Sequence, residues 1–110
     1  MTPEMLDRFR LRLEARKREL MALSQIAEEA RRPVTLDQQS VGRLSRQDAL
    51  QQQAMANAQE QRRLSEARRI DAALARIDAD DFGYCDACGE DIVVKRLEID
   101  PTVLRCIDCA

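Results

Sequence analysis

The sequence predicts a mainly α-helical protein, in which an antiparallel two-helix coiled-coil hairpin leads into a small C-terminal module built around four cysteines. Three observations support this class. Ala, Leu, Arg, Glu and Gln dominate the 110 residues, and only three glycines and three prolines interrupt them, which is helical usage. The only aromatic residues are two Phe and one Tyr, too few for a large globular core. All four cysteines lie within residues 85–109.

The first helix is expected over about residues 3–32. Thr2 is a suitable N-cap, and Pro3 suits the first helical position because its missing N–H would have no helical partner there. Apolar residues then recur in steps of three and four, as in a heptad seam: Leu6, Phe9, Leu13, Leu20, Leu23, Ala27 and Ala30. Pro33 cannot continue a helix and is expected to end it.

A connecting tip is expected over about residues 33–46 and a second helix over about residues 47–80. Ser45 and Asp48 have the spacing of a capping box that would start this helix. Its second half carries a clear apolar seam: Leu64, Ala67, Ile70, Leu74 and Ile77. Neither helix can cover its seam alone. The proline-broken connection favours an intramolecular hairpin, residues 1–80, in a monomer; a parallel homodimeric coiled coil is the alternative.

The four cysteines form two C-x-x-C pairs, Cys85 with Cys88 and Cys106 with Cys109, separated by 17 residues. Such pairs predict one structural zinc ion in a closed tetrahedral site, within a module spanning residues 81–110. Free thiols or disulfides are the alternatives. Gly89 follows the first pair, where a tight turn needs a permissive backbone. Residues 92–94, Ile-Val-Val, suit a short strand, and Phe82 and Tyr84 are expected to pack where the helix meets the module.

Several function classes are disfavoured. The chain has no histidine, so it lacks the usual general base and catalytic zinc ligand, and an enzyme is not expected. Residues 80–110 hold eight acidic and three basic side chains, the wrong sign for binding a phosphate backbone, so no direct DNA binding is expected. No apolar run approaches the ~20 residues of a membrane span. Paired C-x-x-C motifs without a visible secretion signal indicate a reducing cytoplasm.

The C-terminal motif resembles the zinc finger of the DksA/TraR family. The resemblance is carried by D-F-G-Y-C-x-x-C-G at residues 81–89, R-L at 96–97, Pro101, and C-I-D-C at 106–109. It implies a bacterial regulator that binds RNA polymerase and inserts its coiled coil into the secondary channel. Such regulators modulate transcription initiation without contacting DNA, in some cases together with guanosine tetraphosphate.

The tip departs from the family pattern. The best-studied members carry an acidic D-x-x-D-x-A signature there, and an ungapped count back from Cys85 places Ser45 where an aspartate would stand. The residues expected to contact a partner are Asp37, Arg43, Arg46 and Asp48. Asp48 as a cap of Ser45 and Asp37 as a turn residue are the structural alternatives. The chain has no basic C-terminal helix after the last cysteine, so dependence on guanosine tetraphosphate is not expected.

Two further functions compete with a polymerase regulator. A zinc-stabilised coiled-coil adaptor for another protein, with no effect on polymerase, fits the same fold and would favour a dimer. A redox or zinc sensor would use the C-x-x-C thiols directly and requires cysteines that exchange readily.

Overall fold

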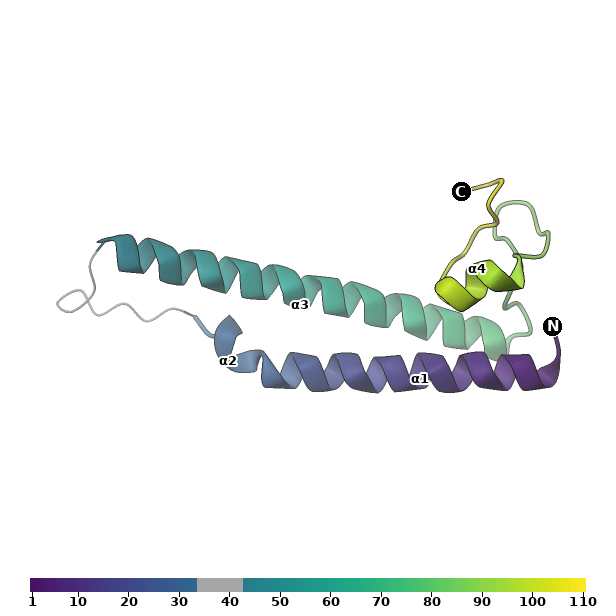
Figure 1. Ribbon diagram of the computed structural model, residues 1–110, viewed down its shortest axis with the longest axis horizontal. Coiled ribbons are helices and arrows are strands. Elements are labelled where there is room, and N and C mark those ends of the chain that lie inside the picture. The colour runs from purple at the N-terminus through teal and green to yellow at the C-terminus, as the bar shows by residue number, and fades with distance from the viewer. Residues whose placement is uncertain (34–42) are drawn as a thin grey trace. The chain divides into compact units, whose positions relative to one another are not determined.

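The computed structural model describes residues 1–33 and 43–110, and its helices are α1 (Pro3–Ile26), α2 (Glu28–Arg31), α3 (Arg43–Asp78) and α4 (Val94–Ile99) (Figure 1). The described residues contain no strand, only an isolated antiparallel bridge between Tyr84 and Asp91. The predicted mainly helical class with a four-cysteine C-terminal module is therefore confirmed. No described helix has the length and apolar character that crossing a membrane requires.

The chain divides into two compact units: residues 1–18 with 67–110, and residues 19–66. This division differs from the expected one at residue 80, because the start of α1 and the end of α3 belong with the cysteine-containing segment. The separation into a hairpin of residues 1–80 and a finger of residues 81–110 stays a prediction.

The first unit has an apolar core shared by α1, α3, α4 and the loops between them. Its fully or almost fully buried side chains are Phe9, Leu13, Ile70, Ala73, Ile77, Phe82, Ile92 and Leu97. Here α1 and α3 run antiparallel, since Arg10 pairs with Asp78 and Lys17 with Asp71, each at 2.7 Å. Five of the eight lie on α1 and α3 and three lie in residues 81–110, so the helices and the finger share one core.

Phe82 packs against Phe9 of α1, with ring centroids 5.4 Å apart and planes tilted by 50°, a favourable aromatic geometry. This confirms that Phe82 ties the finger to a helix. Tyr84 is half exposed, and the same expectation for it stays a prediction. Arg12 of α1 adds a polar tie by donating a hydrogen bond to the carbonyl of Glu98 in the last turn of α4, where helical carbonyls lack backbone partners.

The ends of the helices follow local chemistry. Thr2 Oγ1 accepts a hydrogen bond of 3.2 Å from the N–H of Met5, which confirms the predicted N-cap. The C-terminal end of α3 is a Schellman turn. In it the N–H of Asp81 donates to the carbonyl of Arg76 (2.8 Å), and the N–H of Asp80 donates to the carbonyl of Ile77 (3.3 Å). Asp80 has the left-handed φ of +59° that this turn requires.

In the second unit, α1 ends at Ile26, and the short α2 follows after a turn at Ala27. The single helix expected to residue 32 is thus interrupted. The α1 and α3 segments are antiparallel here as well, since Ser24 bonds Glu60 and the Gln53 side chain donates to the carbonyl of Arg32. Among the described residues of this unit, the buried apolar ones are Leu20 and Ala56.

Three sequence expectations need correction. The second helix begins at Arg43, not near residue 47, so Ser45 lies inside α3 and the Ser45–Asp48 capping box is wrong. Residues 92–94 form no strand; Val94 instead begins α4, which turns Leu97 into the core. Leu23 and Leu64 were expected in the seam but are 41% and 42% exposed. The remainder of the expected tip, residues 34–42, lies outside the described residues.

Candidate metal centre

The first cysteine pair is held by a narrow loop that the Tyr84–Asp91 bridge closes. Within it the N–H of Cys85 donates to the carbonyl of Glu90 (2.8 Å), and the N–H of Gly89 donates to the carbonyl of Cys85 (2.9 Å). Gly89 has a φ of +78°, and a Cβ there would meet nothing within 4 Å. The need for glycine is therefore conformational, as the sequence predicted.

The second pair occupies a similar turn, in which the N–H of Cys109 donates to the carbonyl of Cys106 (3.2 Å). Three contacts join it to the rest of the module. The N–H of Asp86 donates to the carbonyl of Leu104 (2.9 Å), and the Arg105 guanidinium pairs with the Asp86 carboxylate at 3.3 Å. Arg96 of α4 donates from Nε to the carbonyl of Arg105 (3.0 Å). These bonds hold the two turns side by side.

The four Sγ atoms converge as the sequence predicted. Those of Cys85, Cys88, Cys106 and Cys109 all lie within 4.8 Å of one another, and the Cys88 and Cys106 sulfurs are 3.7 Å apart. Tetrahedral zinc with bonds of ~2.3 Å separates its sulfur ligands by about 3.8 Å. The donor set and its spacing thus fit one tetrahedral zinc ion.

Electrostatics at the cluster point the same way. Hydrogen bonds from the backbone N–H groups of Cys106, Cys88 and Ala87 lower the pKa of the Cys85 thiol to about 6. The pKa of Cys109 rises to about 12, mainly through its side-chain hydrogen bond with Cys106. Thiolates this close repel one another. A divalent cation removes that conflict, because it binds sulfur in the deprotonated form.

Cys85 is almost fully buried, with 3% of its surface exposed, whereas Cys88 is exposed. Four thiolates around one ion leave no coordination position for water or a substrate. The arrangement therefore suits architecture and not Lewis-acid chemistry.

The expected tip residues have different outcomes. Asp37 lies outside the described residues. Arg43 is the first residue of α3, Arg46 in the first turn is half-buried, and Asp48 in the second is exposed. No described contact tests whether these residues bind a partner.

Sequence reasoning missed a second polar feature, formed by Ser24, Arg31, Glu60 and Arg63 in the residue 19–66 unit. Its signal was present in the sequence: Glu60 and Arg63 continue the spacing of three and four residues that runs through Ala67 and Ile70.

Residues 80–110 match the family described as "Prokaryotic dksA/traR C4-type zinc finger". The "RNA polymerase-binding transcription factor DksA" of Haemophilus influenzae is 57% identical over 42 residues, which are 38% of this chain and 29% of the relative. The Escherichia coli protein of the same name is 45% identical over 42 residues, 38% of this chain and 28% of the relative. The matched region thus spans less than a third of these relatives.

Likeness in structure extends further along the chain. The transcription factor DksA2 of Pseudomonas aeruginosa has a TM-score of 0.81 to this chain at 26% sequence identity, and the match covers 99% of this chain and 82% of that one. The finger motif, the relatives and the shared fold agree. Residues 80–110 thus match the dksA/traR C4-type zinc finger, and the chain as a whole has the fold of DksA2.

Proposed function

We propose that this protein binds RNA polymerase through the secondary channel and modulates transcription initiation without binding DNA. The observation that carries the proposal is the fold match to DksA2 over 99% of the chain, together with a finger whose relatives are named as RNA polymerase-binding.

In this proposal the finger is structural. Cys85, Cys88, Cys106 and Cys109 hold one zinc ion, which cross-links the two turns. The cysteines fix the finger against α1 and α3 through the core that contains Phe82 and Leu97. With no open ligand position and no histidine, the chain is a regulator and not an enzyme. It acts where polymerase acts, in the cytoplasm, as a monomer.

The acidic finger supports a protein partner over DNA. Eight acids against three bases in residues 80–110, with the negative charge of four thiolates around zinc, repel a phosphate backbone. The exposed Asp48 and the neighbouring Arg46 sit in the first two turns of α3. With Asp37 and Arg43, they are proposed to contact polymerase at the tip.

The test is a binding and promoter-complex assay with purified, zinc-saturated protein and polymerase. We expect the wild-type chain to bind polymerase and change the lifetime of promoter complexes. Asp37→Ala, Arg43→Ala, Arg46→Ala and Asp48→Ala should reduce that change while zinc content and helicity persist, and Gln59→Ala on exposed α3 surface serves as the control. Normal regulation by all four variants would disprove the tip assignment, and no binding by wild type would disprove the function.

An adaptor for a different protein is the second candidate. It is favoured by apolar side chains exposed on the finger, where Val93, Ile99 and Ile107 are 63%, 82% and 73% exposed, since such surface often marks a protein contact. An adaptor would leave promoter complexes unchanged and sediment as a dimer. We do not propose that guanosine tetraphosphate is required.

A further inference from the structure

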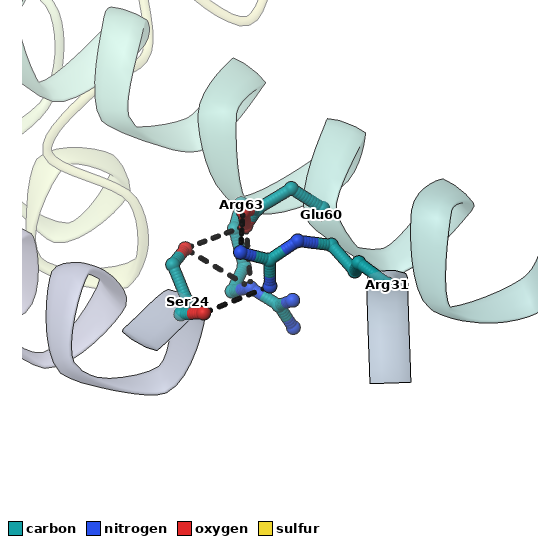
Figure 2. Close-up of polar contacts among 4 residues, drawn as sticks. All are labelled: Ser24, Arg31, Glu60 and Arg63. Carbon is teal, nitrogen blue, oxygen red and sulfur yellow. Dashed lines mark hydrogen bonds and ion pairs between the residues drawn. The ribbon is translucent and has the colours of Figure 1, made fainter. Parts of the chain in front are cut away.

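Within the unit of residues 19–66, four polar side chains meet where a coiled-coil seam is normally apolar (Figure 2). We call them the polar layer: Ser24 from α1, Arg31 from α2, and Glu60 and Arg63 from α3. Figure 2 shows Glu60 at the centre, with Ser24 and both arginines directed toward it. The side chains of Glu60, Arg63 and Arg31 are only 13%, 16% and 20% exposed, so the layer is largely removed from water.

Glu60 binds every other member. Ser24 Oγ donates to Glu60 Oε1 at 2.5 Å, and Arg63 Nε pairs with the same oxygen at 3.1 Å. Arg31 pairs with the other oxygen at 3.3 Å. The hydrogen bond from Ser24, followed by the contacts with the arginines, lowers the pKa of Glu60 against the opposing effect of burial.

The polar layer also contacts the backbone at the end of α1. Arg31 Nη1 donates to the backbone carbonyl of Ser24 at 2.8 Å while its other nitrogen pairs with Glu60. The carbonyls of a final helical turn need such partners. One arginine thus links the end of α1 to the middle of α3.

The layer competes with an apolar alternative next to it in the sequence. Leu23 precedes Ser24 and Leu64 follows Arg63, yet both leucines are about two-fifths exposed (41% and 42%). On α1, the inward face that includes Leu20 can continue three residues later to Leu23 or four residues later to Ser24. On α3, the inward face that includes Ala67 can continue three residues earlier to Leu64 or four residues earlier to Arg63. Both steps lie on one helical face. Hydrophobic burial favours the leucine face, and the structure has the polar one.

We propose that the polar layer selects the rotational alignment of α1 and α3 in this unit, against a competing alignment that buries Leu23 and Leu64. Polar residues at seam positions are known to specify alignment at a cost in stability. That cost is visible here: among the described residues, Arg63 Nη2 is a buried side-chain nitrogen without a hydrogen-bond partner. Loss of Glu60 would leave two arginines facing each other and so favour the leucine alignment.

The first experiment uses Glu60→Gln in the full, zinc-bound chain, with methyl-resolved NMR and a soluble paramagnetic probe. In the wild type the probe should enhance the relaxation of the Leu23 and Leu64 methyls to an intermediate degree. That enhancement should exceed the one at the buried Leu20 (2% exposed) and be smaller than the one at the exposed Leu11 (65%). In Glu60→Gln we expect both to fall toward the Leu20 level. Arg62→Gln, at an exposed neighbouring position, should leave them unchanged. Unchanged relaxation in a folded Glu60→Gln protein overturns the proposal.

The second experiment covers the case in which Glu60→Gln unfolds the unit. Leu23→Gln and Leu64→Gln are added to remove the competing face. If the polar layer selects the alignment of α1 and α3, the variant with all three substitutions should have more amide protection in residues 20–31 and 53–64 than Glu60→Gln alone. If Glu60 only adds stability, losing two half-buried leucines restores no protection. Recovery of protection thus supports the proposal, and its absence overturns the proposal.

Discussion

Leu13 and Leu11 lie two residues apart in α1 but have opposite environments, with 1% and 65% of their surfaces exposed. Leu13→Ala should lower the free energy of unfolding by about 2–5 kcal/mol, because it leaves a cavity in the first unit. Leu11→Ala should change it by less than about 0.5 kcal/mol. Urea unfolding of the zinc-saturated protein measures both. Equal losses would contradict the packing of α1.

Glu60 should make the second unit sensitive to acid. Its pKa lies below the ordinary value of 4.5, chiefly because of the hydrogen bond from Ser24. A lowered pKa in the folded state contributes stability above pH 4.5 that is lost as pH falls through the folded-state pKa. Amide exchange in residues 53–64 should therefore accelerate in acid more for the wild type than for Glu60→Gln. Glu28→Gln, at an exposed position, is the control, and parallel pH profiles would refute the expectation.

Among single residues, the convergence of the four cysteine sulfurs was predictable, because two C-x-x-C pairs specify such a cluster by local spacing alone. The seam was predictable only in part. Ile70 and Ile77 are buried as expected, but steps of three and four from Leu20 are equally helical. Which neighbour faced inward depended on Glu60, whose partners come from elsewhere in the chain.

Among the elements, α3 is followed by a turn residue, Asp80, whose type is not ideal for that turn. Asp80 adopts a φ of +59°, which an L-residue occupies at a cost that glycine avoids. Asp80→Gly should raise the free energy of unfolding by about 0.5–1 kcal/mol, and Asp80→Ala should lower it by a similar amount. Thermal unfolding of the zinc-bound protein gives the order. A more stable alanine variant would show that the Schellman turn is not maintained.

Zinc removal tests the finger as an element. Since structural zinc contributes ~10–16 kcal/mol in peptide fingers, chelation should remove the amide protection of α4 and of residues 81–110. Helix in residues 19–66 should persist. Circular dichroism and amide exchange before and after chelation measure this, and a spectrum unchanged by zinc loss would contradict it.

The element that sequence reasoning misjudged is α4. Three β-branched residues at 92–94 have strand propensity, but Leu97 is fully buried and Arg96 bonds the carbonyl of Arg105. A helical turn from Val94 satisfies both. Tertiary contacts thus overrode local propensity, and those contacts cannot be predicted from residues 92–94 alone. The interruption at Ala27 was missed for a similar reason, because Arg31 bonds back to Ser24.

For the whole molecule, the helical class and the position of the finger followed from composition and cysteine spacing. The grouping of residues 1–18 with 67–110 did not, because it arises from side chains such as Phe9 and Phe82 that meet only after folding. Polymerase entered through resemblance, since neither charge nor periodicity names a partner.

The expected oligomeric state is also a property of the whole chain. The antiparallel pairing of α1 with α3 covers Leu13 and Ile70 within one chain, so we expect sedimentation equilibrium to give the mass of a monomer across protein concentrations. A concentration-independent dimer would contradict this and favour the adaptor.

The Phe9–Phe82 contact has a consequence for synthesis. It joins residues that leave the ribosome far apart in time, since domains emerge N-terminal first at ~5–20 residues per second. Residues 19–66 are contiguous and can pair as soon as they emerge, whereas Phe9 must wait for Phe82 in the finger. A nascent chain stalled before Cys106 would therefore expose Phe9 to chaperones, and release of the second cysteine pair would end that exposure.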